Sequence, residues 1–197
     1  MRLLIYSIVL ISFCSNARAE KILLLGDSLS AAYGMVWEQG WAQLLAEELA
    51  HDHELINASV SGETTGGGLA RLPALLEEHQ PDSVIIELGG NDGLRGYPLN
   101  VIRKNLLRMG QLVQDDNRQL MYLGIRIPPN YGQRYTNAFT ALYPAVADEL
   151  DAPYLDLYIE EIALDSTMMQ EDKLHPTVKA QVMLKETVGN FLLKQMN

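Results

Sequence analysis

Ser28 is a residue whose type and setting could support covalent chemistry. It ends the triplet Gly26-Asp27-Ser28, which directly follows an apolar run that begins at Lys21. A serine hydroxyl at the end of a strand can attack an acyl carbon, provided that a base takes its proton and a third group orients that base. The alternative is that Ser28 caps the start of a helix, which is a common role for serine.

His175 is a candidate for the base, with Asp172 as the group that orients it. Pro176 disfavours the α conformation at His175, so the imidazole is expected on a stiff, extended segment ahead of a helix. Asp172 stands three residues earlier. From there its carboxylate could fix the imidazole tautomer and stabilise the imidazolium that forms when His175 takes the serine proton. Alternatively, Asp172 merely caps a turn and His175 is exposed.

An acyl-transfer site also needs hydrogen-bond donors for the negative charge of a tetrahedral intermediate. Three candidates are the backbone amides of Ser28 and Gly62 and the side-chain amide of Asn91. Gly62 has no side chain to block a substrate oxygen, and Asn91 follows two glycines that allow a sharp turn. Taken singly, these are ordinary loop residues. Their positions after successive predicted strands favour a shared site.

A regular alternation of strands and helices would position these residues. Short apolar runs predict strands at 22–25, 55–58, 83–88, 120–125 and 153–157. Apolar residues at helical spacing predict helices at 41–49, 68–79, 101–113 and 139–150, and a last helix after Pro176. We therefore predict an α/β fold, with a five-stranded parallel sheet between two helical layers. Ligands bind such sheets at the carboxyl ends of the strands, where the candidate residues fall.

The first nineteen residues are predicted to be a secretory signal peptide. Arg2 supplies a positive start, residues 3–13 form a mostly apolar run, and Ala17-Arg18-Ala19 is a small-x-small cleavage site. The apolar run is too short to span a bilayer as a helix. Cleavage after Ala19 would leave residues 20–197 as a single domain.

Cys14, the only cysteine, raises an alternative for this leader. It could be a lipid attachment site, but Phe13 is large where lipoprotein signals have a small residue. Cleavage after Ala19 would leave a mature chain without cysteine and hence without disulfides. No second long apolar segment follows, so we expect a periplasmic or secreted protein with no integral membrane segment.

The charge balance limits the classes of partner that the protein can bind. The chain has 15 Lys and Arg residues against 25 Asp and Glu residues, and loss of Arg2 and Arg18 with the leader would change the formal charge from −10 to −12. Such a surface repels nucleic acid and anionic membranes. His51 and His53 lack the cysteine or spaced carboxylates of a metal site, so we expect them at the surface and expect no metal. We also expect a monomer.

Four short blocks, taken in order, resemble those of the SGNH (GDSL) hydrolases. They are Gly26-Asp27-Ser28, the Gly62 loop, Gly89-Gly90-Asn91-Asp92 and Asp172-x-x-His175. The stretches NASVSGETTGGGLARLPALLEEHQP, ELGGNDGLRG and PPNYGQRY look like the bacterial thioesterase I, lysophospholipase L1 and arylesterase subfamily. The likeness covers essentially the whole predicted mature chain and implies the flavodoxin-like SGNH fold.

The resemblance implies a role for each matching residue. Ser28 would be the nucleophile, His175 the general base and then acid, and Asp172 its orienting partner. The amides of Ser28 and Gly62 and the side chain of Asn91 would form the oxyanion hole. No metal or cofactor is implied.

The implied activity is that of an exported serine esterase or thioesterase acting through an acyl-Ser28 intermediate. Acyl thioesters, aryl esters and lysophospholipids are the implied substrates, with transient contact to lipid substrates. One alternative is a carbohydrate O-acetyl esterase of the same fold, which would place polar groups beside Ser28. Another is a binding module without catalysis, in which helix N-termini grip an anion.

The loop at residues 126–135 could contribute to substrate binding. Ile127, Pro128 and Tyr131 could wall one side of an acyl groove. The alternative is an ordinary long connection with surface tyrosines.

Lys173 departs from the family pattern, which usually has glycine after the catalytic aspartate. If that position takes positive φ, lysine there costs roughly 1 kcal/mol or more. Two other acidic residues, Asp27 and Asp92, are expected to accept loop amide hydrogen bonds and not to act as acids. Glu87 lies within an apolar strand, and the sequence does not identify its partner.

Overall fold

The computed structural model describes residues 19–157 and 160–196. Residues 1–18 of the predicted signal peptide, including Cys14, lie outside the described residues. Within the described part of the chain, no helix combines the length and apolar character needed to cross a bilayer.

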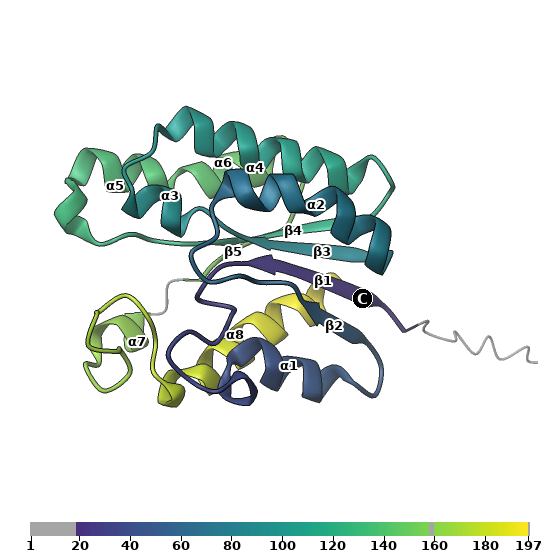
Figure 1. Cartoon of the computed structure of the whole chain (residues 1–197), viewed down its shortest axis with the longest axis horizontal. Coiled ribbons are helices and arrows are strands. Elements are labelled where there is room, and N and C mark those ends of the chain that lie inside the picture. Colours follow the sequence, from purple (N-terminus) through teal and green to yellow (C-terminus); the bar gives the residue numbers. More distant parts are fainter. Residues whose placement is uncertain (1–18, 158–159, 197) are drawn as a thin grey trace, which may run out of the picture.

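A five-stranded parallel sheet forms the centre of the molecule (Figure 1). Its strands are β1 (Lys21–Gly26), β2 (Glu54–Asn57), β3 (Ser83–Glu87), β4 (Gln119–Gly124) and β5 (Tyr154–Asp156). They lie side by side in the order β2-β1-β3-β4-β5, with every pair parallel. This is the flavodoxin-like order, and the predicted fold class is confirmed.

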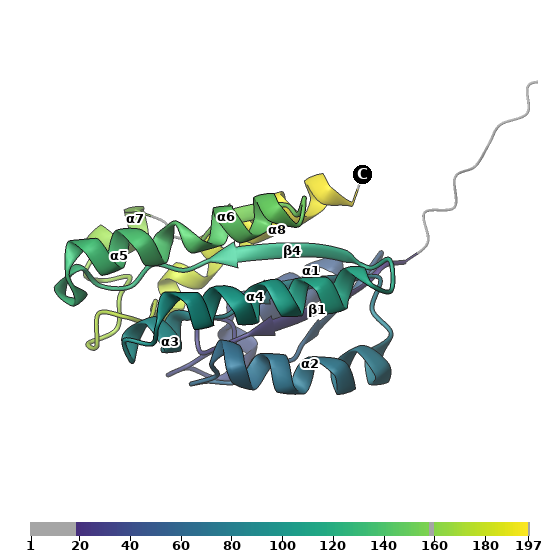
Figure 2. The same ribbon diagram turned by 90° about the horizontal axis from the view of Figure 1, so that it is seen from above.

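Helices cover both faces of the sheet. They are α1 (Trp41–Leu49), α2 (Thr65–His79), α3 (Gly90–Leu94), α4 (Leu99–Gln114), α5 (Gln133–Thr140), α6 (Leu142–Glu149), α7 (Glu160–Leu164) and α8 (Val178–Gln195), with 3-10 turns η1 (Trp37–Gln39) and η2 (Pro129–Tyr131). In Figure 1, α2, α4 and α6 lie above the sheet, and α1 and α8 lie below it. Seen from above, α4 lies between α2 and α6 (Figure 2). The result is three layers.

Alternation along the strands divides the core into two parts. In β1, Leu23 and Leu25 pack with the upper helices, whereas Ile22 and Leu24 pack with α1 and α8. All four side chains are fully buried because both sheet faces are covered. This is why the predicted strand appears in the sequence as a continuous apolar run.

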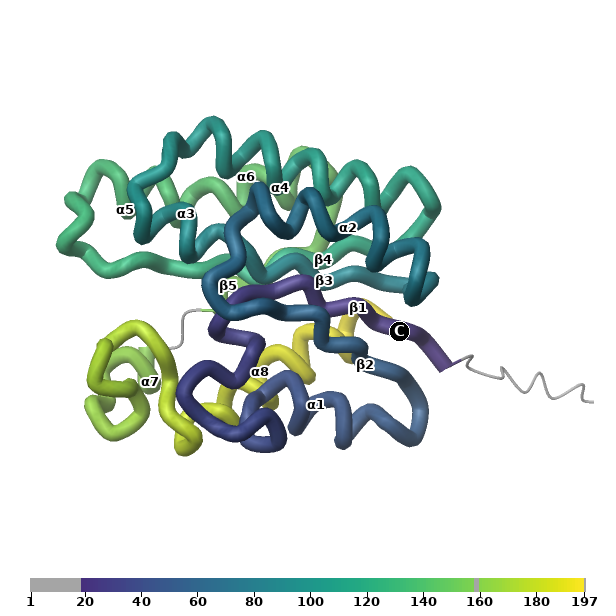
Figure 3. Tube along the Cα trace, in the orientation of Figure 1, coloured from purple at the N-terminus to yellow at the C-terminus, as the bar shows by residue number. Residues whose placement is uncertain are grey.

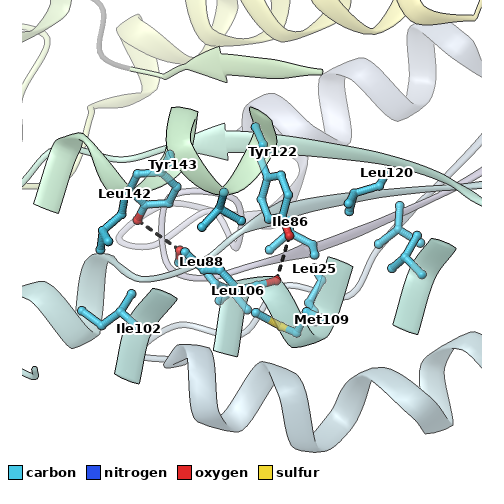
Figure 4. Close-up of a cluster of buried hydrophobic side chains, with 14 of the residues drawn as sticks. Leu25, Ile86, Leu88, Ile102, Leu106, Met109, Leu120, Tyr122, Leu142 and Tyr143 are labelled. Atoms are coloured by element: carbon cyan, nitrogen blue, oxygen red, sulfur yellow. Dashed lines mark hydrogen bonds between the residues drawn. The ribbon is translucent and has the colours of Figure 1, made fainter. Parts of the chain in front are cut away.

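Two buried hydroxyl groups tie the upper layer to the sheet (Figure 4). Tyr122 on β4 donates to the Leu106 carbonyl of α4 at 2.7 Å, and Tyr143 on α6 donates to the Leu88 carbonyl at 3.1 Å. Leu88 directly follows β3, so the second bond anchors the backbone beside Gly89, where the chain turns toward Asn91.

Several helical segments differ from the sequence prediction. The single helix expected at 139–150 is two helices, α5 and α6, that meet at Ala141. Pro144 explains the break, because it has no N–H to donate and its ring clashes with the carbonyl four residues back. The last helix begins at Val178, two residues beyond Pro176, with Thr177 in the N-cap position. Helix α3 was not predicted, because its glycine-rich sequence lacks an apolar face.

Candidate active site

The predicted site residues meet at the carboxyl ends of the central strands. Ser28, Gly62, Asn91 and His175 line one cleft of about 220 Å³. In Figure 3, the loop after β1 lies beside the segment that precedes α8. A hydrogen bond of 2.9 Å from Gln170 Nε2 to the Tyr33 carbonyl joins these two segments.

Ser28, His175 and Asp172 form a continuous hydrogen-bonded chain. The Ser28 Oγ lies 2.8 Å from His175 Nε2, and His175 Nδ1 lies 2.7 Å from Asp172 Oδ2. Partial burial raises the pKa of Asp172, but hydrogen bonds from His175 and Leu174 outweigh it and lower that pKa below its ordinary value. An ionised Asp172 accepts a hydrogen bond from Nδ1–H, which leaves the Nε2 lone pair free to accept the Ser28 proton.

The backbone around His175 is held by hydrogen bonds to the segment around Met169 and Gln170. Pro176 forms an antiparallel bridge with Met169, and the Gln170 amide donates to the His175 carbonyl at 2.8 Å. The side chain of His175 is only 17% exposed. Asp172 both caps a turn and orients the imidazole. Its Oδ1 accepts hydrogen bonds from the backbone amides of Leu174 and His175, and its Oδ2 faces the imidazole.

Ser28 lies in a turn and does not cap a helix. The Ala31 amide donates to the Asp27 carbonyl at 3.0 Å, and the following residues form turns up to η1. The hydroxyl group of Ser28 is therefore available to His175.

The candidate oxyanion donors surround the same cleft. Gly62 has φ +82° and its missing side chain faces open space, so a substrate oxygen could approach its N–H. Arg95 donates to the Gly62 carbonyl at 3.3 Å. Asn91, in the first turn of α3, donates one Nδ2 hydrogen to Asp27 Oδ2 at 3.0 Å. The second Nδ2 hydrogen can then serve a substrate oxygen.

The substrate loop is divided between two hollows. Ile127 and Pro128 line the cleft. Tyr131 borders a second hollow instead, with Tyr135 and Leu99, and its role in substrate binding stays a prediction. The η2 turn and Gly132, at φ +89°, direct the chain away from the cleft after Pro128.

Tyr33 is a residue of the cleft that the sequence interpretation missed. Its ring centroid lies 4.3 Å from that of His175, with the ring planes tilted by 35°. The signal available was an aromatic residue five positions after Ser28 in the same loop. The remaining wall combines four apolar side chains with four other residues: Leu29, Leu94, Ile125 and Leu174 with Asp27, Ser61, Gly90 and Arg126.

The two carboxylates beside the site accept hydrogen bonds, as predicted. Asp92 accepts the Thr65 amide at 2.9 Å and its hydroxyl at 2.6 Å. Asp27 accepts the Leu29 amide at 3.1 Å in addition to Asn91. Burial raises the pKa of Asp27 from 3.8 to about 6. Across residues 19–157 and 160–196, no cluster of three or more His, Cys, Asp or Glu side chains could hold a metal ion.

Lys173 adopts positive φ, 55°, directly beside Asp172. We expect Lys173→Gly to keep turnover within about threefold, because glycine adopts this conformation without strain. Lys173→Val should lower turnover about tenfold or more, because a β-branched residue resists positive φ and would displace Asp172 and His175. Esterase kinetics measure both, with the exposed neighbour Glu171→Val as control. Unchanged turnover in Lys173→Val would contradict this interpretation.

The raised pKa of Asp27 predicts a pH-dependent stability. The folded protein favours the protonated form of Asp27. The free energy of unfolding of the wild type should therefore fall by roughly 1–3 kcal/mol relative to that of Asp27→Asn as the pH rises from about 4 to about 7. Urea unfolding at several pH values measures this difference. As a control, Asp165, whose pKa is lowered by hydrogen bonds from Thr167, should give an Asp165→Asn difference that stays constant over the same interval. A constant difference for Asp27→Asn would refute the prediction.

Comparison with known proteins gives a consistent result. Residues 24–182 match the GDSL-like Lipase/Acylhydrolase family. An arylesterase of Vibrio mimicus is 45% identical over 190 residues, covering 93% of this chain and 95% of that protein. Thioesterase 1/protease 1/lysophospholipase L1 of Escherichia coli K12 is 43% identical, covering 96% of this chain and 91% of that protein.

A solved structure extends the likeness to three dimensions. Esterase EstA from Pseudoalteromonas sp., inhibited by monoethylphosphonate, superposes with a TM-score of 0.87 at 43% identity, over 90% of this chain and 99% of that one. The family match spans well over half of the chain and includes Ser28, Gly62, Asn91, Asp172 and His175. The chain therefore belongs to the GDSL-like lipase/acylhydrolase family, the SGNH hydrolases that its sequence motifs predict.

Proposed function

We propose that this hydrolase cleaves acyl esters and thioesters through an acyl-Ser28 intermediate. Ser28 Oγ attacks the carbonyl carbon and its proton passes to His175 Nε2. The tetrahedral intermediate collapses, the bond to the alcohol or thiol breaks, and the leaving group takes the proton from His175. Water then attacks the acyl carbon while His175 Nε2 takes one of its protons. The bond between the acyl carbon and Ser28 Oγ breaks, Nε2 returns the proton to Oγ, and the carboxylic acid is released.

The observation that carries this proposal is the chain of two short hydrogen bonds from Ser28 to Asp172. The distances of 2.8 and 2.7 Å are those of a nucleophile in contact with its base and a base in contact with its orienting group. Asp172 stabilises the imidazolium that forms after proton transfer, because its lowered pKa keeps it ionised.

The amides of Ser28 and Gly62 and the side chain of Asn91 would stabilise the oxyanion. Each lies just after a different strand, and all three residues line the cleft. Donors of this kind act on charge that appears only in the transition state. Asp27 supports the arrangement by holding the Asn91 amide.

The character of the cleft favours acyl chains over acetylated sugars. The side chains of Ile125, Ile127, Pro128 and Leu94 in its wall cannot hydrogen-bond to sugar hydroxyl groups, and they outnumber the polar Ser61 and Arg126. The names of the relatives, arylesterase and thioesterase 1/lysophospholipase L1, point the same way. We therefore propose acyl thioesters, aryl esters and lysophospholipids as substrates.

We further propose that the enzyme works after export. Support comes from the charged start, short apolar run and Ala17-Arg18-Ala19 of the leader, which predict cleavage after Ala19 and a mature domain of residues 20–197.

Ser28→Ala should abolish turnover and labelling by a fluorophosphonate probe, because only an activated serine reacts with it. Asn91→Ala should retain labelling at a reduced rate and lose about 10²–10³-fold in turnover, the usual effect of removing one oxyanion donor. Ser166→Ala, at an exposed serine that does not line the cleft, is the matched control. Full turnover in Ser28→Ala would end the proposal.

A turnover panel tests the substrate class. Acyl thioesters, aryl esters and lysophospholipids should be compared over a range of chain lengths with an acetylated sugar, using Ser28→Ala as the blank. We expect kcat/KM to rise from acetyl to longer acyl groups, because each buried CH₂ contributes about 0.8 kcal/mol. A preference for the acetylated sugar would support the carbohydrate esterase instead.

A further inference from the structure

Glu87 is a fully buried carboxyl group that the proposed reaction does not use. It is the last residue of β3, pairs in register with Gly26 of β1, and has 0% exposure. A carboxyl group in this position needs an explanation, because burial of an acid without strong compensation is costly.

The contacts of Glu87 lie on both sides of Ser28. Its Oε2 accepts the Asp27 amide at 3.1 Å and the Ser30 hydroxyl at 2.7 Å. Ser28 stands between these two residues, so one oxygen atom holds both ends of the turn that presents the nucleophile. Gly26 leaves the necessary room, because a Cβ there would lie 2.7 Å from Glu87 Oε2.

The same group is connected to the oxyanion donor. The Asp27 backbone is bound to Glu87, and the Asp27 side chain accepts the Asn91 amide at 3.0 Å and the Leu29 amide at 3.1 Å. Displacement of Asp27 would therefore move the nucleophile turn and the Asn91 side chain together.

The charge state of Glu87 suits this role. Burial, and then the neighbouring Asp27 carboxylate, raise the pKa of Glu87 well above its ordinary value, which favours its neutral form. Its two oxygens also differ: Oε2 accepts both hydrogen bonds, whereas Oε1 has no hydrogen-bond partner among the described residues. A neutral carboxyl group accepts hydrogen bonds without placing a second anion near the oxyanion hole.

We infer that Glu87 is a positioning residue for the reaction proposed above: by accepting hydrogen bonds from Asp27 and Ser30, it holds Ser28 and, through Asp27, Asn91 in their reactive geometry. The inference rests on the proposed function of Ser28. A merely space-filling role for Glu87 makes a different prediction, because then any side chain of similar volume would suffice.

Two substitutions of similar size distinguish these roles. Glu87→Gln keeps a neutral acceptor and should hold kcat within about threefold of wild type. Glu87→Met fills the space without an acceptor and should lower kcat about 10²-fold, the loss expected from a misplacement of about 1 Å, with KM changed less than about threefold. Fluorophosphonate labelling should slow in the same order. Ile85→Val, on the same strand and face, controls for a loss of packing.

Three outcomes would overturn the inference. They are a folded Glu87→Met with wild-type kcat, equal losses in Glu87→Gln and Glu87→Met, and a loss of the same size in Ile85→Val. If Glu87→Met does not fold, Ser30→Ala provides the test, because it removes one of the two hydrogen-bond donors to Glu87. It should lower kcat about fivefold, the equivalent of one ordinary hydrogen bond. An unchanged kcat would refute the inference. Turnover by Ser28→Ala, in contrast, would refute the proposed function itself.

Discussion

The site depends on one hydrogen bond between residues that are 147 positions apart, from the Ser28 hydroxyl group to His175 Nε2. Two separate parts of the fold must position the donor and the acceptor of this hydrogen bond. The parallel sheet ends β1 beside β3, which sets the position of the Ser28 turn, while the bridge between Met169 and Pro176 holds the histidine segment. The hydrogen bond from Gln170 to the Tyr33 carbonyl then joins the two parts next to the reacting atoms.

Carboxyl groups take different roles here because their surroundings differ. Asp172 is partly exposed and receives hydrogen bonds from His175, so it stays ionised and can stabilise an imidazolium. Asp27 and Glu87 are buried beneath the nucleophile, where desolvation raises the pKa of each. The family likeness identifies the chemistry of this ester hydrolase, and the geometry of these acids accounts for how its groups are held.

The sequence predicted most of the framework, for reasons that the structure explains. Strands buried on both faces appear as continuous apolar runs, and sites in parallel sheets follow strand ends, so Ser28, Gly62 and Asn91 could be grouped. Features that depend on contacts between residues distant in sequence were not predicted. The position of Tyr33 against His175, the turn of Tyr131 into a second hollow, and the partners of Glu87 depend on how loops pack. The break at Pro144 was visible in the sequence but was outweighed by helical periodicity.

The most direct test is a crystal structure of the protein after reaction with a phosphonate ester. The account predicts a covalent bond to Ser28 Oγ, with His175 Nε2 beside the ester oxygens. The phosphoryl oxygen should lie about 2.7–3.1 Å from the amides of Ser28 and Gly62 and from Asn91 Nδ2. An adduct on another residue, or a phosphoryl oxygen that points away from all three donors, would contradict it.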